Sequence, residues 1–161
     1  MSLEETVRQL QDRVDIQDLV FHYCRCADNL DGKAIASLFT EDGEADFTNG
    51  QLPVARGHEG LMRFFAAALA DVASSSHHIS NIELLFESRD TVIAQTYMYA
   101  WQRFKDHPER PDAHLWGRYQ LRLVRTPQGW RYSKLRLIFA GHSSAARIRE
   151  HLGRPWPPSF G

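Results

Sequence analysis

A carboxylate and a histidine, two residue types that often cooperate in proton transfer, stand out in this chain by their positions. Asp28 continues an apolar stripe, because stepping back four residues at a time along a predicted helix meets Cys24, Val20 and Ile16. A carboxylate that points inward needs a partner. It either caps the following turn through its side chain, which is the commoner role, or belongs to a site.

His77 and His78 begin a predicted strand, where an imidazole can act as a general base near neutral pH. Neighbouring residues of a strand face opposite ways, so only one of the two can point inward. Strict alternation places His78 on the side of Ile82, Leu84 and Phe86, and His77 on the side of Ile79, Asn81, Glu83 and Leu85. Alternation alone does not choose between them, and a lone histidine at a strand start is more often structural.

A further run of aromatic residues could form the wall of an apolar pocket. Tyr97, Tyr99 and Trp101 alternate with small or slender residues, so one face of their strand is bulky, although plain core packing is the alternative. The other histidines show no metal-binding spacing, and we find no phosphate-binding glycine loop, Gly-x-Ser-x-Gly turn or dinucleotide motif. The sequence therefore leaves two possible functions: chemistry that needs neither cofactor nor metal, or ligand binding alone.

The elements that must position these residues follow from periodicity. Helical spacing predicts one helix over 3–27, kinked near Asp15, with shorter helices over 33–39 and 57–70 and a short strand over 44–47. After a loop at 73–76, extended runs predict strands over 77–87, 91–105, 114–126 and 130–140. Helices followed by an antiparallel meander indicate an α+β domain whose sheet curls around the helices.

Composition bounds the function. The 161 residues, 43% of them hydrophobic, suit one domain spanning 1–161, and a net charge of −1 gives no reason to expect nucleic acid as a partner. Neither a signal peptide nor a membrane-spanning stretch is found, so we expect a cytoplasmic protein without a membrane partner.

Cys24 and Cys26 point in different directions on a helix and are expected to be small buried side chains. Trp156 and Phe160 predict that the proline-rich tail packs on the domain.

Several short motifs in order resemble the SnoaL-like group of the nuclear transport factor 2-like superfamily. They are Ile16-Gln17-Asp18-Leu19-Val20, Tyr23, Ala27-Asp28, Leu38-Phe39-Thr40-Glu41-Asp42, His77-His78-Ile79-Ser80-Asn81 and Gly129-Trp130-Arg131-Tyr132-Ser133. The resemblance implies a cone-shaped α+β barrel, in which N-terminal helices pack in a curved antiparallel sheet around an apolar pocket.

The resemblance also implies site residues. Scytalone dehydratase, bile acid 7-alpha-dehydratase and the lindane dehydrochlorinase use an Asp near the end of the first helix and a His at the start of the strand after the third. These match Asp28 and His77, which stands four residues before Asn81, while Tyr23 is similar in position to a tyrosine of the bile acid enzyme. The expected pocket residues are Phe47, Phe65, Tyr97, Tyr99, Trp101, Tyr119 and Phe139, of which Phe47 replaces a tyrosine of the dehydratases.

The expected function is that of a cofactor-independent, dehydratase-like lyase or an isomerase, acting on a hydrophobic cyclic molecule of polyketide, steroid or aromatic-degradation type. Two alternatives stay open: the non-catalytic small subunit of a ring-hydroxylating dioxygenase, which has a similar Leu30-Asp31-Gly32 turn, and a pocket protein that only binds its ligand. We also expect a homodimer or homotrimer.

Overall fold

The long first helix forms because its N-terminus is capped and its inward face is apolar. In a computed structural model, which describes residues 2–50, 52–105 and 109–143, α1 (Leu3–Asp28) runs without interruption. The Ser2 hydroxyl accepts a hydrogen bond from the backbone of Glu5, whose carboxylate bonds back to the N–H of Ser2. The helix ends at Asn29, and Leu30 follows with a φ of 57°.

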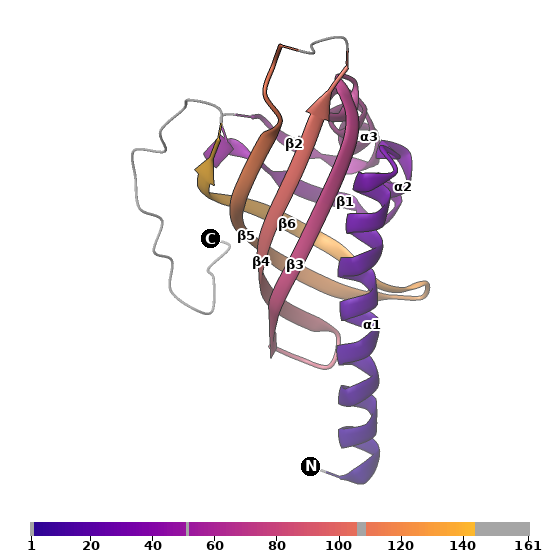
Figure 1. Ribbon diagram of the computed structural model, residues 1–161. Helices are drawn as coiled ribbons and strands as arrows, with labels where there is room; N and C mark the ends of the chain where they lie inside the picture. The colour runs from indigo at the N-terminus through magenta and orange to yellow at the C-terminus, as the bar shows by residue number, and fades with distance from the viewer. Residues whose placement is uncertain (1, 51, 106–108, 144–161) are drawn as a thin grey trace.

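The remaining elements form two further helices and six strands (Figure 1). They are α2 (Gly32–Ser37), β1 (Phe39–Asp46), the 3-10 turn η1 (Thr48–Gly50), β2 (Val54–Arg56), α3 (Gly57–Leu69), β3 (Val72–Phe86), β4 (Thr91–Phe104), β5 (Ala113–Thr126) and β6 (Gly129–His142). The α+β class is therefore confirmed, with the helices first and the long strands after them.

One curved sheet has the strand order β2-β1-β6-β5-β4-β3. The four long strands form the predicted antiparallel meander, but β1 pairs with β6 in parallel, so the sheet is mixed rather than fully antiparallel. It is also open, because β2 and β3 are its two edges. The ion pair of Arg136 with Asp46, at 3.0 Å, links β6 to β1.

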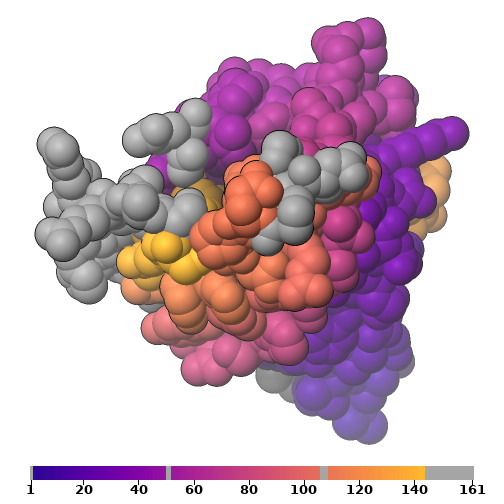
Figure 2. Space-filling model, turned by 45° about the horizontal axis from the view of Figure 1, so that its top comes forward, coloured from indigo at the N-terminus to yellow at the C-terminus, as the bar shows by residue number. Residues whose placement is uncertain are grey.

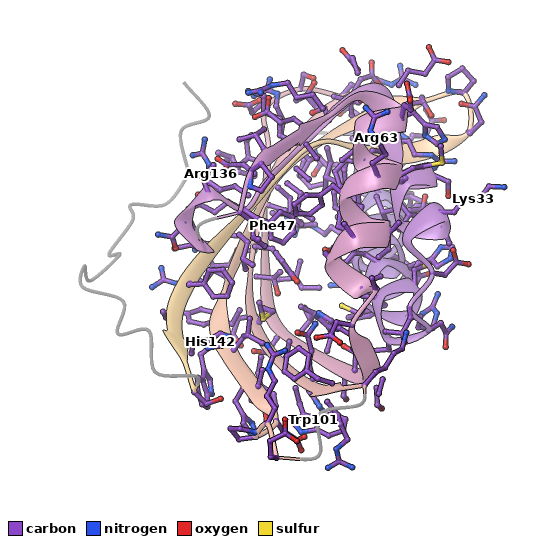
Figure 3. The ribbon with its side chains drawn as sticks, turned by 90° about the horizontal axis from the view of Figure 1, so that it is seen from above. Lys33, Phe47, Arg63, Trp101, Arg136 and His142 are labelled. Atoms are coloured by element: carbon purple, nitrogen blue, oxygen red, sulfur yellow. The ribbon has the colours of Figure 1, made fainter. Side chains whose placement is uncertain are left out.

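The core lies between the helices and the face of the sheet turned toward them (Figure 3). From α1 it receives Ile16, Leu19, Val20, Tyr23, Cys24, Cys26 and Ala27. Both cysteines are free and buried, as predicted.

Local boundaries differ from the prediction in three places. Residues 73–76 belong to β3 instead of a loop, because they pair with β4 from Val72 onward. Phe39 begins β1 instead of ending a helix, and β2, only three residues long, carries too little pattern to be found from sequence. Trp156, Phe160 and the expectation for the tail lie outside the described residues.

Candidate active site

Asp28 and His77 lie in direct contact although they are 49 positions apart. The ring Nδ1 of His77 is 2.7 Å from one carboxylate oxygen of Asp28, and the backbone N–H of His77 donates to the other at 3.1 Å. The Ser75 hydroxyl lies 3.4 Å from the same Nδ1. Asp28 does not cap the following helix, since that role belongs to Asp31, whose side chain accepts from the N–H of Ala34.

The position of β3 explains why a backbone group is available to Asp28. β3 is an edge strand with β4 as its only neighbour among the described strands, so part of its backbone faces away from the sheet. The last turn of α1 lies beside that edge (Figure 1) and brings the Asp28 carboxylate to the N–H of His77. Ring and backbone therefore hold the same carboxylate.

A bulge in β3 decides which histidine points inward. His77 pairs with Ala100, and two residues, Asn81 and Ile82, stand opposite one residue of β4. Asn81 has a φ of 54°, a conformation that asparagine tolerates better than most residues. The extra residue shifts the alternation by one, so His77 faces the helices together with Ile82, against strict alternation. His78 lies on the outer face, beside Tyr99.

The contact with Asp28 sets the state of the imidazole ring. A carboxylate only accepts, so Nδ1 carries a hydrogen and, in the neutral ring, Nε2 keeps its lone pair. Within the described part of the chain, Nε2 has no hydrogen-bond partner. The His77 side chain is only 8% exposed, against 30% for Asp28. The ring is therefore oriented and largely shielded from solvent, and its Nε2 has the lone pair that accepting a proton requires.

Tyr23 lies one helical turn before Ala27, and its side chain belongs to the core. Its ring packs edge-on against Phe65, Tyr119 and Tyr132, with ring centroids 5.5–6.3 Å apart. Burial, with the charge of Cys24 added, raises the pKa of the Tyr23 hydroxyl well above its ordinary value, and the side chain of Tyr119 offsets this only in part. The hydroxyl therefore stays protonated and can donate a hydrogen bond.

Cys24, on the same stripe as Asp28, is not an active nucleophile. Burial, followed by the charge of Asp28, raises the pKa of its thiol to about 12. The thiolate, which is the reactive form, is therefore scarce near neutral pH.

Four expected pocket residues gather on the helix-facing side. Phe47, Phe65, Tyr119 and Phe139 are all buried members of the core. Phe47 points toward α3 (Figure 3), and its ring lies 6.2 Å from that of Phe65. All four belong to the core on the same side of the sheet as His77.

The other three expected pocket residues lie on the opposite, outer face of the sheet, which corrects the expectation. The partner of His77 in β4 is Ala100, so the small residues of this strand face the helices and the aromatic ones face away. Tyr97 is 48% exposed beneath Arg118, the Tyr99 hydroxyl lies 2.8 Å from Nδ1 of His114, and the Trp101 indole donates to Asp112. Figure 3 shows Trp101 at the end of the sheet, far from Phe47.

Comparison with known proteins identifies the family to which the chain belongs. The family model described as a SnoaL-like domain matches residues 8–136. The chain belongs to this family. No curated protein sequence matches it.

Solved structures share the fold of this SnoaL-like domain. One from Novosphingobium aromaticivorans DSM 12444, provisionally named a scytalone dehydratase, is 24% identical with a TM-score of 0.82, over 93% of this chain and 99% of the other. A hexachlorocyclohexane dehydrochlorinase (LinA type 2) is 20% identical with a TM-score of 0.77, over 94% and 99%. A provisionally named aromatic ring hydroxylase from Novosphingobium aromaticivorans is 27% identical with a TM-score of 0.76, over 82% and 91%. The resemblance seen in the sequence is thus confirmed.

The sequence pattern also contained a buried carboxylate, Asp12, that the predicted site of this SnoaL-like domain did not include. Asp12, only 3% exposed, accepts from Arg125 at 2.8 Å with both oxygens and from the Trp130 indole at 3.2 Å. Its signal was present, because Asp12 stands four residues before Ile16 and so begins the stripe that Asp28 ends. With both its oxygens bound to a cation, Asp12 fastens α1 to β5 and β6.

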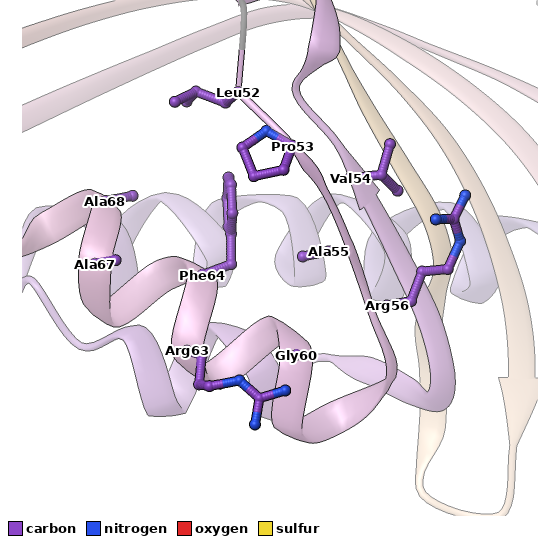
Figure 4. A pocket seen from close by; sticks show the side chains of 10 residues that line it. All are labelled: Leu52, Pro53, Val54, Ala55, Arg56, Gly60, Arg63, Phe64, Ala67 and Ala68. Carbon is purple, nitrogen blue, oxygen red and sulfur yellow. The ribbon is translucent and has the colours of Figure 1, made fainter.

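Two hollows lie elsewhere on the surface. One, of about 600 Å³, lies between β2 and α3 and is lined by Leu52, Pro53, Val54, Ala55, Arg56, Gly60, Arg63, Phe64, Ala67 and Ala68 (Figure 4). The other is lined by Ser37, Phe39, Glu41 and His58. Neither touches Asp28 or His77. Among the described residues, no three His, Cys, Asp or Glu side chains group as metal ligands, and no helix could span a membrane.

Proposed function

We propose that this SnoaL-like domain is a cofactor-independent lyase of the dehydratase type, or an isomerase, acting on a hydrophobic cyclic small molecule. The observation that carries the proposal is the double contact of His77 with Asp28, which leaves Nε2 as an oriented base. The apolar core on the helix-facing side of the sheet, toward which His77 points, favours a substrate without charge. Dehydratase and dehydrochlorinase names among structures of the same fold agree with this class of chemistry.

In the proposed reaction, Nε2 of His77 removes a proton from a carbon next to an activating group. In an elimination, the electrons of that C–H bond form the new double bond, and the neighbouring bond to the leaving group breaks. A hydroxide leaving group takes the proton from the imidazolium and departs as water. In an isomerisation, the proton returns to a different carbon. Asp28 stabilises the imidazolium and maintains the tautomer throughout.

A protonated phenol is proposed to assist. Tyr23 keeps its proton because burial raises its pKa, so it is suited to donate to a substrate oxygen on which negative charge develops. Phe47, Phe65, Tyr119 and Phe139 are the proposed walls for the hydrophobic ring. Phe47 offers no hydroxyl, so it adds shape but no second hydrogen bond.

The test uses the neighbouring histidine as a matched control. Native mass spectrometry of the purified protein first identifies any retained ligand. Cyclic ketones with a hydroxyl or halogen on the β-carbon are then incubated in D2O and followed by NMR for product and for deuterium at the activated carbon. His77→Ala should lower turnover about 10²- to 10⁴-fold, whereas His78→Ala, which changes an outward-facing ring, should retain it. Equal activity of both variants would exclude His77 as the base.

The second candidate is the non-catalytic small subunit of a ring-hydroxylating dioxygenase. It is supported by the ring hydroxylase name of a structure that is 27% identical over 91% of its own length. Affinity capture of the tagged chain from its native host should then bring down a larger subunit that carries an iron-sulfur cluster. Capture of that subunit, with no turnover on the panel, would favour this candidate. Ligand binding without either result would leave a binding protein.

A further inference from the structure

The N-terminal half of α1 carries apolar side chains that nothing in the described chain covers. They follow one line along the outer side of the helix and are exposed to 79%, 57%, 57%, 52% and 41% at Leu3, Val7, Leu10, Val14 and Phe21. These five residues are called the outer stripe below. Figure 1 shows this half of α1 extending past the end of the sheet, and Figure 2 shows it as an open surface of the molecule.

The outer stripe does not arise from helix packing within the domain. The inward side of α1 is occupied from Asp12 to Ala27, whereas no residue from Leu3 to Gln11 is buried. Two residues along a helix correspond to a turn of about 200°, so Leu10 points away from the buried Asp12 and Val14 points away from Ile16. The helix therefore has two apolar sides, and the described part of the domain covers only one of them.

The spacing of the stripe identifies what fits it. Steps of four, three and four residues separate Leu3, Val7, Leu10 and Val14, which is a heptad pattern with leucine at the d positions and valine at the a positions. In parallel coiled coils, β-branched residues at a with leucine at d favour an assembly of two helices. In a parallel pair with a second copy of the chain, each residue of the stripe would face the same residue of the other copy.

Charges beside the stripe distinguish the direction of pairing. In a parallel pair, Arg13 at a g position lies opposite Asp18 of the partner subunit at an e position, and the two-fold axis makes this contact twice. An antiparallel pair aligned over the whole stripe would instead place Glu4 against Asp18 of the partner subunit, and Arg13 against Arg13 of the partner subunit. Both contacts would join like charges. The charge pattern therefore agrees with the parallel arrangement.

We propose that the outer stripe of α1 is an interface with a second copy of this chain, formed by parallel, coiled-coil-like pairing of the two helices. The stripe is short, but the helix is already formed by its capping box and by the packing of its other side, so pairing does not have to nucleate it. The two domains lie on opposite sides of the helix pair, because the stripe faces away from the sheet.

The first test is a site-directed cross-link in the full chain. Leu10→Cys at a d position faces its own copy in the proposed dimer, whereas Asp15→Cys, on an exposed position beside the stripe, faces away. The native cysteines are buried and do not compete. Mild oxidation should convert Leu10→Cys, but not Asp15→Cys, to a disulfide-linked dimer on a denaturing gel. Equal cross-linking of the two variants, or none in Leu10→Cys, would overturn the proposal.

The second test measures the assembly in solution. By sedimentation equilibrium, Val7→Glu combined with Leu10→Glu should halve the mass of the assembly, with circular dichroism confirming that the domain stays folded. Asp18→Arg alone should raise the dimer Kd about 2- to 30-fold, and adding Arg13→Asp should reverse much of that rise. An unchanged mass in the double glutamate variant would show that the copies meet elsewhere or not at all.

Discussion

His77 donates to the Asp28 carboxylate twice, once through its backbone N–H at 3.1 Å and once through its ring at 2.7 Å. The first bond fixes the carboxylate to the strand, and the second fixes the ring to the carboxylate. The ring orientation is therefore set by the same edge of β3 from which the side chain projects.

This double contact predicts a single tautomer. In 15N NMR spectra of the neutral ring, Nδ1 of His77 should resemble a protonated pyrrole nitrogen and Nε2 an unprotonated one. Asp28→Ala removes the acceptor and should yield a mixture of tautomers. A spectrum of the native protein with the proton on Nε2 would contradict the assigned roles.

The pair should also behave as one unit in catalysis. Asp28→Asn can present an amide that favours the wrong tautomer, so its loss of kcat should approach that of His77→Ala. The variant that carries both changes should be little slower than either alone. Steady-state kinetics on a turned-over substrate provide the measurement. Multiplied losses in the combined variant would mean that the residues act independently.

The bulge at Asn81 predicts an unusual substitution pattern. Because Asn81 has a φ of 54°, Asn81→Gly should be nearly neutral, whereas Asn81→Val should destabilise the fold by about 1–2 kcal/mol. Urea unfolding monitored by tryptophan fluorescence measures both. Deletion of Asn81 should restore strict alternation and abolish turnover, because the strand must then turn either His77 or the apolar residues after it away from the core. Equal stability of the Gly and Val variants would contradict this.

Asp12 should matter more than its neighbours for stability. Asp12→Ala leaves Arg125 without its main acceptor and the Trp130 indole unpaired, at a cost of about 3 kcal/mol. Arg125 retains Asp90, 3.0 Å away, which keeps the loss from being larger. The exposed Asp15→Ala should change the free energy of unfolding by less than about 0.5 kcal/mol. Similar losses in both variants would rule out a special role for Asp12.

Acid should weaken the contact between β1 and β6. Burial opposes ionisation of Asp46, but bonds from Thr48 and the charge of Arg136 outweigh it, so its pKa lies below the ordinary 3.8. The unfolded chain therefore binds the proton first. The stabilisation is complete above the ordinary pKa and is lost as the pH falls through the folded value. Asp46→Asn should flatten the acid side of the stability profile and Thr48→Val should do so in part. A profile that Asp46→Asn leaves unchanged would contradict this.

The order of elements could be predicted from periodicity along the chain. The partnership of Asp28 with His77 could be predicted only through the resemblance to the SnoaL-like group, because periodicity left open which histidine faces inward. The face of Tyr97, Tyr99 and Trp101 could not, since alternation separates two faces without saying which one meets the helices. The bulge that turns His77 inward includes Asn81, whose φ is positive. Asparagine tolerates a positive φ, but its presence in a sequence does not predict one. Asp12 lay on a visible stripe, but its partner Arg125 is 113 positions away and no local pattern connects them.

The edge of β3, which pairs with no second strand among the described residues, has a consequence for solubility. An exposed strand edge offers unpaired N–H and C=O groups on which a strand of another molecule can assemble, the first step toward aggregation. Here the Asp28 carboxylate occupies the N–H of His77 and the bulge at Asn81 interrupts the edge a few residues further on. A charge and a kink on an edge are common protections against such growth. The contact that orients the imidazole thus also opposes edge-to-edge pairing of this sheet with the sheet of another molecule.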